Sequence, residues 1–203
     1  MFHKRTTRKT IKEKPDQVFS SHPYIDLNKL VKWNIEFDLG LMGKMAKKGD
    51  VFLREGQRCD HLYGILKGFA RVYYLDLEGK EITHWFCAKD SIITSPFSFV
   101  KGETNILFFE ALEDTELILI SSSQLEKLIH HLPELGEAFR HINAEFAMVL
   151  SRRIMSIHTK TAEERYLNLM KEHPLLFQKA KLSHIASFLG ITQQSLSRIR
   201  KNL

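Results

Sequence analysis

The chain has 203 residues, of which 43% are hydrophobic, enough for one large domain or for a medium domain with a small appendage. No apolar run reaches the ~20 residues of a membrane span, and the basic N-terminus lacks the apolar stretch of a signal peptide, so we expect a cytoplasmic protein without membrane contact. Two isolated cysteines, Cys59 and Cys87, exclude a disulfide framework and favour buried, reduced thiols.

The net charge of +6 is unevenly distributed. Residues 1–14 carry six Lys/Arg and one acidic residue. Residues 15–151 carry fourteen Lys/Arg and twenty acidic residues, and residues 152–203 carry ten Lys/Arg and three acidic residues. A basic C-terminal part on an acidic body is typical of a protein in which one small domain faces a polyanion. Membrane phosphate is disfavoured as that polyanion, because the C-terminal part shows no basic amphipathic helix with a broad apolar face.

The N-terminal part predicts a basic, disordered arm over residues 1–20. After Asp26, apolar residues recur at helical spacing and predict one lead-in helix: Leu27, Leu30, Val31 and Ile35. Gly40 and Gly43 then interrupt the pattern.

Residues 51–86 hold short runs of β-branched and aromatic residues separated by glycine, and two further runs reach Ser121. Turn signals at Gly56, Gly68 and Gly79 indicate an antiparallel all-β unit. Residues 90–104 break the alternation and contain Pro96 and Gly102, which is where a ligand cradle could lie in such a unit.

A short helix is predicted over residues 123–132, and a long helix from Pro133 to about Thr159. Along the long helix, apolar residues alternate four and three apart as in a heptad seam: Leu135, Phe139, Ile142, Phe146 and Val149. Such a stripe either pairs two helices into a dimer or lies on the chain's own β-unit. Thr161 and Glu164 form a capping box, so a new helix and a domain boundary are expected here.

Residues 181–201 predict a helix-turn-helix. Ile185, Ala186, Phe188 and Leu189 give the first helix an apolar face, Gly190 supplies the turn, Thr192 is an N-cap candidate, and Leu196 and Ile199 face inward on the second helix. The segment contains neither Asp nor Glu. Its outward polar residues suit DNA, since Gln bonds adenine and Arg bonds guanine in bidentate geometry. The alternative is two packed helices with a solvated polar face.

The order of a glycine-punctuated β-unit, a long helix and a helix-turn-helix resembles the superfamily of the cyclic-AMP receptor protein and the FNR oxygen sensor, the Crp/Fnr regulators. The resemblance covers nearly the whole chain from about Lys47 and is carried by EALEDTELILIS, AEERYLNLM and IASFLGITQQSLSRIRK, among others. It implies an α+β fold in which a cyclic-nucleotide-binding-like β-roll (jelly-roll, residues 21–132), a long dimerisation helix (133–160) and a helix-turn-helix domain (161–203) follow one another.

The resemblance also implies a homodimeric transcription regulator that binds double-stranded DNA at an inverted-repeat operator, with RNA polymerase as a further partner. Base contacts carry over to Gln193, Gln194, Ser197 and Arg198, and phosphate contacts are assigned to Thr192, Ser195 and Lys201. Gln194 stands where relatives usually have Glu, so the preferred half-site should differ. The β-hairpin wing of the family is not expected within residues 161–203.

The effector pocket departs from the family pattern. The Gly-Glu and Arg-Ser pairs that hold a cyclic nucleotide are replaced by Thr94-Ser95 and Asn105-Ile106. Without the arginine, a cyclic phosphate loses a charge-assisted contact, so cyclic AMP is not expected as the effector. The cysteine group of an iron-sulfur sensor is missing too, and no Cys or His spacing suits haem or zinc, so no metal or cofactor is predicted.

Two other functions compete with a DNA-binding regulator. A ligand-binding module could act through protein contacts of its C-terminal helices, although such a role would not require a cation-rich, carboxylate-free helix. An enzyme is disfavoured, because the sequence shows no P-loop, nucleophile elbow, dinucleotide fingerprint or metal-ligand helix.

Overall fold

The computed structural model describes residues 25–203, so the predicted basic arm lies outside the described residues. The chain begins with α1 (Leu27–Glu36) and continues into β1 (Met42–Ala46), β2 (Val51–Leu53), β3 (His61–Lys67), β4 (Phe69–Leu75), β5 (Glu81–Ala88) and β6 (Ile92–Ile93). Then come α2 (Pro96–Lys101), β7 (Phe108–Ala111) and β8 (Thr115–Ser121). The remaining elements are α3 (Ser122–His131), α4 (Glu134–Thr159), α5 (Ala162–Glu172), α6 (Leu176–Lys179), α7 (Leu182–Phe188) and α8 (Gln193–Lys201).

The strands form two antiparallel four-stranded sheets, in the orders β1-β8-β3-β6 and β2-β7-β4-β5. Side chains of both sheets share one core, in which the rings of Phe52, Tyr63 and Phe109 lie 5.6–5.9 Å apart. We call this unit the β-roll. The expected α+β fold is confirmed, whereas β1 was not predicted, because glycines mask its alternation and its pairing with β8 is non-local.

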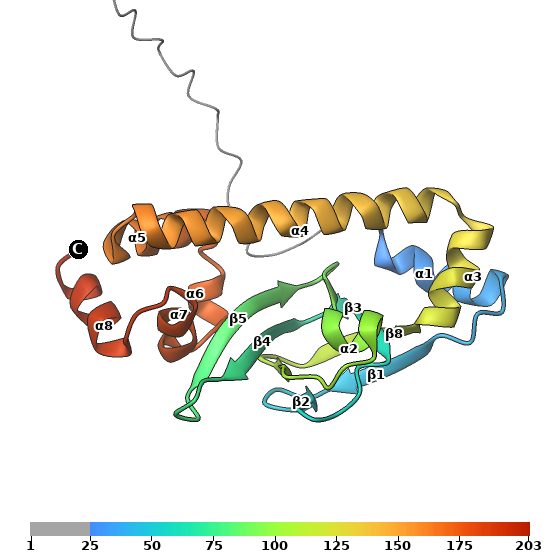
Figure 1. Ribbon diagram of the computed structural model, residues 1–203, viewed down its shortest axis with the longest axis horizontal. Helices are drawn as coiled ribbons and strands as arrows, with labels where there is room; N and C mark the ends of the chain where they lie inside the picture. Colours follow the sequence, from blue (N-terminus) through green and yellow to red (C-terminus); the bar gives the residue numbers. More distant parts are fainter. Residues whose placement is uncertain (1–24) are drawn as a thin grey trace, which may run out of the picture.

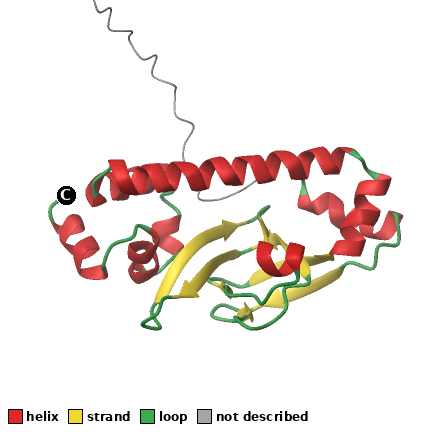
Figure 2. Ribbon diagram, viewed as in Figure 1, coloured by secondary structure: helices red, strands yellow, loops and turns green. Residues whose placement is uncertain are grey.

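The long helix α4 runs along one side of the β-roll, with α1 and α3 at one end of the molecule, α5 to α8 at the other, and α2 beside the strands (Figures 1 and 2). Capping boxes begin the two helices that flank it, at Ser121 with Gln124 and at Thr161 with Glu164. The second of these is the capping box predicted from the sequence. No helix among the described residues is long and apolar enough to cross a membrane.

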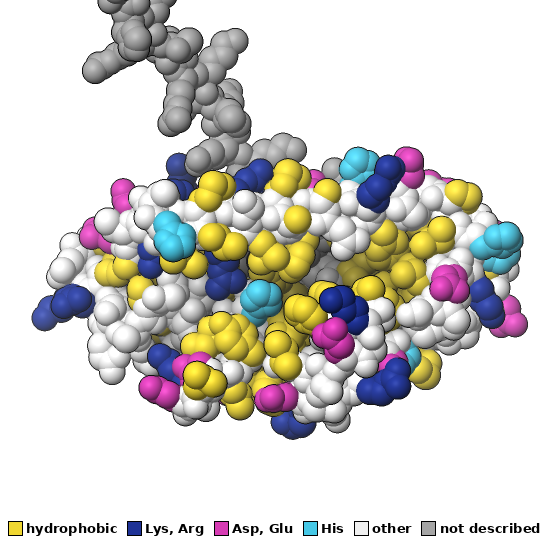
Figure 3. Space-filling model, viewed as in Figure 1, with side chains coloured by type: hydrophobic (Ala, Val, Ile, Leu, Met, Phe, Trp, Pro, Cys, Tyr) yellow, Lys and Arg dark blue, Asp and Glu magenta, His cyan; other side chains and the backbone are white. Residues whose placement is uncertain are grey.

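The predicted dimer seam on α4 needs correction. Leu135 and Ile142 are buried in a core with α1, α3 and β8, and Phe139 packs against the same core. Phe146 and Val149 pack on the β-roll, with the Phe146 ring 5.1 Å from Trp85. The stripe therefore covers the chain's own apolar side, which Figure 3 shows as apolar side chains gathered between α4 and the strands.

Candidate nucleic-acid interface

Helices α7 and α8 form the predicted helix-turn-helix. The apolar face of α7 is buried, and Gly190 turns the chain with φ of +68°, a conformation that glycine adopts without steric cost. The Thr192 side chain accepts a hydrogen bond from the Ser195 amide at 3.1 Å, which caps α8 as predicted. Leu196 is fully buried and Ile199 packs beside it, so the polar residues of α8 face outward.

The outward face of α8 is exposed and cationic. Four side chains predicted to contact bases are exposed, namely Gln193, Gln194, Ser197 and Arg198. Of the three predicted phosphate contacts, Lys201 is exposed, while the hydroxyl groups of Thr192 and Ser195 lie 3.0 Å apart in a hydrogen bond within the cap. Among the ion pairs of residues 25–203, none neutralises a cation of α8.

The helix-turn-helix packs against the β-roll rather than standing apart from it. Its core includes Phe69, Phe86 and Leu112 of the β-roll together with the buried residues of α5–α8. At the polar edge of this contact, the Thr83 amide donates to the Ser187 hydroxyl at 3.1 Å, and that hydroxyl donates to the Thr83 hydroxyl at 2.9 Å. The position of α7 is therefore fixed by β5.

The N-terminal end of α8 opens onto a cleft of about 410 Å³ that it shares with the β4–β5 hairpin. Gln193 and Gln194 line one side, and Arg71, Lys80 and Glu81 line the other. Arg71 is buried and pairs with Glu81 and with Glu110, whose carboxylate lies 2.5 Å from the Arg71 Nε. His184 also lines the cleft, and burial together with Arg71 lowers its pKa to about 4.

Two arginines hold the carboxyl end of α7. Arg153 of α4 donates to the carbonyl of Phe188 at 3.0 Å and to that of His84 in β5 at 2.5 Å. Arg165 of α5 donates from Nη2 to the carbonyl of Leu189 at 3.1 Å. Cations suit this position because the last carbonyls of a helix lack intrahelical partners. Several residues that join distant elements were not predicted, because no local sequence pattern marks them: Arg71, Thr83, Arg153, Arg165 and Ser187.

The predicted effector residues make local contacts or are exposed, and none of them lines either of the two cavities described for this structure. The Asn105 amide donates to the carbonyls of Arg54 and Leu107 and accepts from the Leu107 amide, so it holds a loop. The Thr94 hydroxyl donates to the carbonyl of His61, Ser95 is fully buried, and the Ile106 side chain is exposed. The cradle residues therefore hold the local backbone in this conformation, and their assignment to an effector pocket stays a prediction.

No group of residues within 25–203 has the arrangement of a metal site. The two cysteines are free and buried, as the sequence analysis expects, and burial raises the pKa of the Cys87 thiol.

The fold and its outward cationic helix define a class of protein: a β-roll joined by a long helix to a helix-turn-helix. Residues 44–131 match the cyclic nucleotide-binding domain family. The chain is 22% identical over 168 residues to the transcriptional activator protein Anr of Pseudomonas protegens, covering 77% of this chain and 68% of that relative. It is 24% identical over 164 residues to the cAMP-activated global transcriptional regulator CRP of Pasteurella multocida, covering 74% of this chain and 77% of that relative.

Among solved structures, a variant of CooA from Carboxydothermus hydrogenoformans is similar, with a TM-score of 0.71 and 15% identity over 91% of this chain and 87% of that one. The chain therefore contains a cyclic nucleotide-binding domain, and along most of its length it is similar to Crp/Fnr-type regulators.

Proposed function

We propose that the chain is a homodimeric, sequence-specific DNA-binding transcription regulator, rather than an enzyme, and that its effector is not cyclic AMP. The observation that supports DNA binding best is the face of α8, where exposed Gln and Arg side chains stand on a helix without a single carboxylate. A solvated polar face or a protein-contact module would not require this charge bias. Gln193, Gln194, Ser197 and Arg198 are proposed as base-reading residues and Lys201 as a phosphate contact.

The proposed dimer interface is the outward stripe of α4, not the inward one. Exposed small and apolar residues recur at helical spacing along this stripe: Ala144, Ala147, Met148, Ser151, Ile154 and Met155. Met148, Ile154 and Met155 are 49–60% exposed, and an apolar stripe of this length favours a second copy of the helix. Two recognition helices would then enter successive major grooves, with half-sites one turn, ~34 Å, apart.

The DNA-binding helix is tested by anisotropy titrations with an operator selected from random duplexes. Arg198→Ala should weaken the selected site by about 1 to 3 kcal/mol and relax preference at one base pair. Lys201→Ala should weaken binding to all DNA sequences alike, and should reduce the slope of log affinity against log salt concentration by about one unit. Gln194→Glu should shift preference toward cytosine-containing half-sites, since a carboxylate accepts from cytosine N4.

Lys127→Ala, which removes an exposed lysine of α3 distant from α8 in the fold, is the matched control and should bind as the parent does. If Arg198→Ala and Lys201→Ala both bind selected and random DNA like the parent, α8 is not the reader, and a module that acts through protein contacts is the better account.

A further inference from the structure

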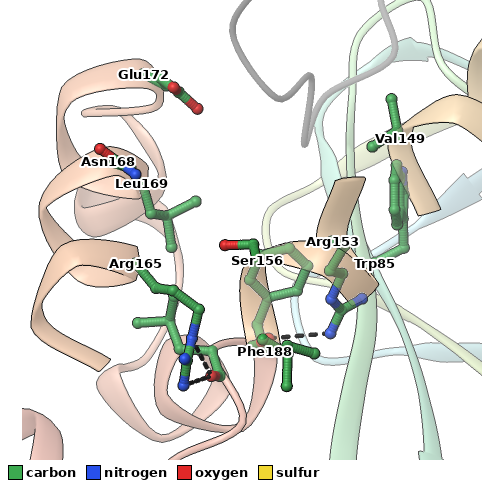
Figure 4. A pocket seen from close by; sticks show the side chains of 11 residues that line it. Trp85, Val149, Arg153, Ser156, Arg165, Asn168, Leu169, Glu172 and Phe188 are labelled. Carbon is green, nitrogen blue, oxygen red and sulfur yellow. Dashed lines mark hydrogen bonds between the residues drawn. The ribbon is translucent and has the colours of Figure 1, made fainter. Parts of the chain in front are cut away.

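A cavity of about 60 Å³ lies where α4, α5, α7 and β5 meet. Figure 4 shows Arg165 and Leu169 of α5 on one side, Arg153 and Trp85 on the other, and Phe188 of α7 between them. The wall is mainly apolar, with two guanidinium groups as its cationic part. Pockets at the junction of domains, with an apolar wall and a few polar groups, are the usual sites of small ligands.

Within residues 25–203, the two cations of this cavity have hydrogen-bond partners but no counter-ion. Among the described residues, every hydrogen bond of Arg153 and Arg165 ends on a backbone carbonyl: those of Thr83, His84 and Phe188, and those of Lys160 and Leu189. The Arg153 guanidinium also lies 4.2 Å from the centre of the Phe188 ring. Carbonyl groups satisfy donors without neutralising charge, and a charge removed from water without a counter-ion is costly.

Both guanidinium groups retain donors for a further acceptor. A guanidinium has five N–H groups. The bonds of Arg153 occupy one N–H on Nη1 and two on Nη2, which leaves Nε–H and the second Nη1–H. Arg165 likewise bonds through Nε, Nη1 and Nη2 once each. The carboxylate that lines the same cavity belongs to Glu172, two turns along α5 from Arg165 and at the opposite end in Figure 4.

We propose that this cavity binds a small organic monocarboxylate with an apolar body, and that this ligand is the effector of the proposed regulator. The carboxylate supplies the charge that Arg153 and Arg165 lack, and the apolar body lies against Trp85, Leu169 and Phe188. The volume corresponds to about four to six water molecules, which selects a short-chain or single-ring acid over a nucleotide.

The effector role rests on the proposed DNA-binding function, because the cavity touches every part that such a regulator must couple. Trp85 belongs to the β-roll, Arg153 to α4 and Arg165 to α5, and both arginines hold the end of α7 just before the turn into α8. A ligand that binds the folded arrangement stabilises it by mass action, by roughly 3 °C in Tm at ten times its Kd.

Fluorescence of Trp85 measures occupancy directly. The chain has two tryptophans, so Trp33→Phe leaves Trp85 as the single emitter. Isobutyrate and benzoate, which bracket the cavity in size, should each change its emission saturably, whereas the neutral benzamide should not. Arg165→Gln should raise the Kd of both carboxylates by about tenfold or more, since one bond to a charged group is lost. Arg140→Gln, on an exposed arginine of α4, should bind as the parent does.

Ser156→Leu fills the cavity from α4, so it should abolish carboxylate binding while the circular dichroism of the protein stays unchanged. This variant tests the proposal even if Arg165→Gln fails to fold. The inference is overturned if neither carboxylate saturates by about 10 mM, if benzamide binds equally, or if Ser156→Leu binds as the parent does. Because this measurement uses no DNA, a failure to bind carboxylates leaves the DNA-binding proposal intact, and a failure to bind DNA leaves the cavity result unaffected.

Discussion

At the residue scale, a few polar side chains join elements that are distant in the chain. Arg71 illustrates this, because its guanidinium is buried in a strand of otherwise apolar and aromatic residues and lies 4.2 Å over the Tyr73 ring. It joins β4 to β5 through Glu81 and to β7 through Glu110. A buried network of this kind fixes geometry more than it adds stability, since desolvation offsets much of the Coulomb gain.

Gly68 marks the point where the chain leaves one sheet and enters the other. Its φ is +110°, and a Cβ added there would lie 2.6 Å from the Thr115 Cα and 2.8 Å from the Asp114 carbonyl oxygen. Gly68→Ala should therefore lower the free energy of unfolding by about 3 kcal/mol or more, because backbone must shift. Gly49→Ala, at φ of +91° with open space, should cost only about 1 to 2 kcal/mol. Urea unfolding measures both free energies of unfolding. Equal losses in the two variants would contradict the close approach of the Asp114 and Thr115 backbone to Gly68.

His84 predicts a pH dependence of stability. Burial, with Arg153 nearby, lowers its pKa to about 4, below the ordinary value of 6.5. The unfolded chain therefore binds the proton more tightly, and stability falls as the pH drops from about 6.5 toward 4. Between pH 7 and pH 5 the loss due to His84 should be about 1 to 2 kcal/mol. Urea unfolding of His84→Gln should show a smaller acid loss than the parent, whereas exposed His158→Gln should match the parent.

At the element scale, α4 presents two different stripes. The inward stripe packs on the β-roll and against α3, and the outward stripe is the one left for a partner helix. A heptad pattern in the sequence reports that one side of a helix is apolar, but not which surface covers it.

The two stripes respond differently to a charge. Met148→Asp, on the outward stripe, should shift the protein from dimer to monomer with little change in Tm, because the side chain is half exposed in the protomer. Phe146→Asp should lower Tm instead, since it removes the contact with Trp85. Light scattering at micromolar concentration and thermal unfolding separate the two effects. If the wild-type protein is a monomer, the dimer proposal is wrong. If Phe146→Asp gives a stable monomer, the inward stripe is the dimer interface.

At the scale of the whole molecule, the β-roll is filled from within. The Trp85 ring of β5 contacts the Phe146 ring of α4, and the Asn105 side-chain amide donates to the backbone carbonyls of Arg54 and Leu107. Cyclic AMP should therefore show no binding at micromolar concentration in calorimetry, because neither Asn105 nor Ile106 supplies a cation for its phosphate. A micromolar or tighter Kd would show that another cation serves the phosphate, and that the β-roll opens to admit the ligand.

The sequence by itself determined the elements whose signals are local. Glycine-punctuated alternation predicted an antiparallel all-β unit, the capping box at Thr161 predicted the start of α5, and Gly190 with Thr192 predicted the turn and the cap of α8. Period and capping depend on residues within one or two turns, so they can be read along the chain.

Only the tertiary structure decided which surfaces these elements share. It placed the heptad stripe of α4 on the β-roll, bonded the Asn105 amide to the backbone of Arg54, and brought Arg153 and Arg165 to the end of α7. Thr83 and Ser187 are 104 residues apart and nevertheless share a hydrogen bond. Contacts between residues so distant in sequence depend on how whole elements pack, and a single sequence carries no local pattern that records them.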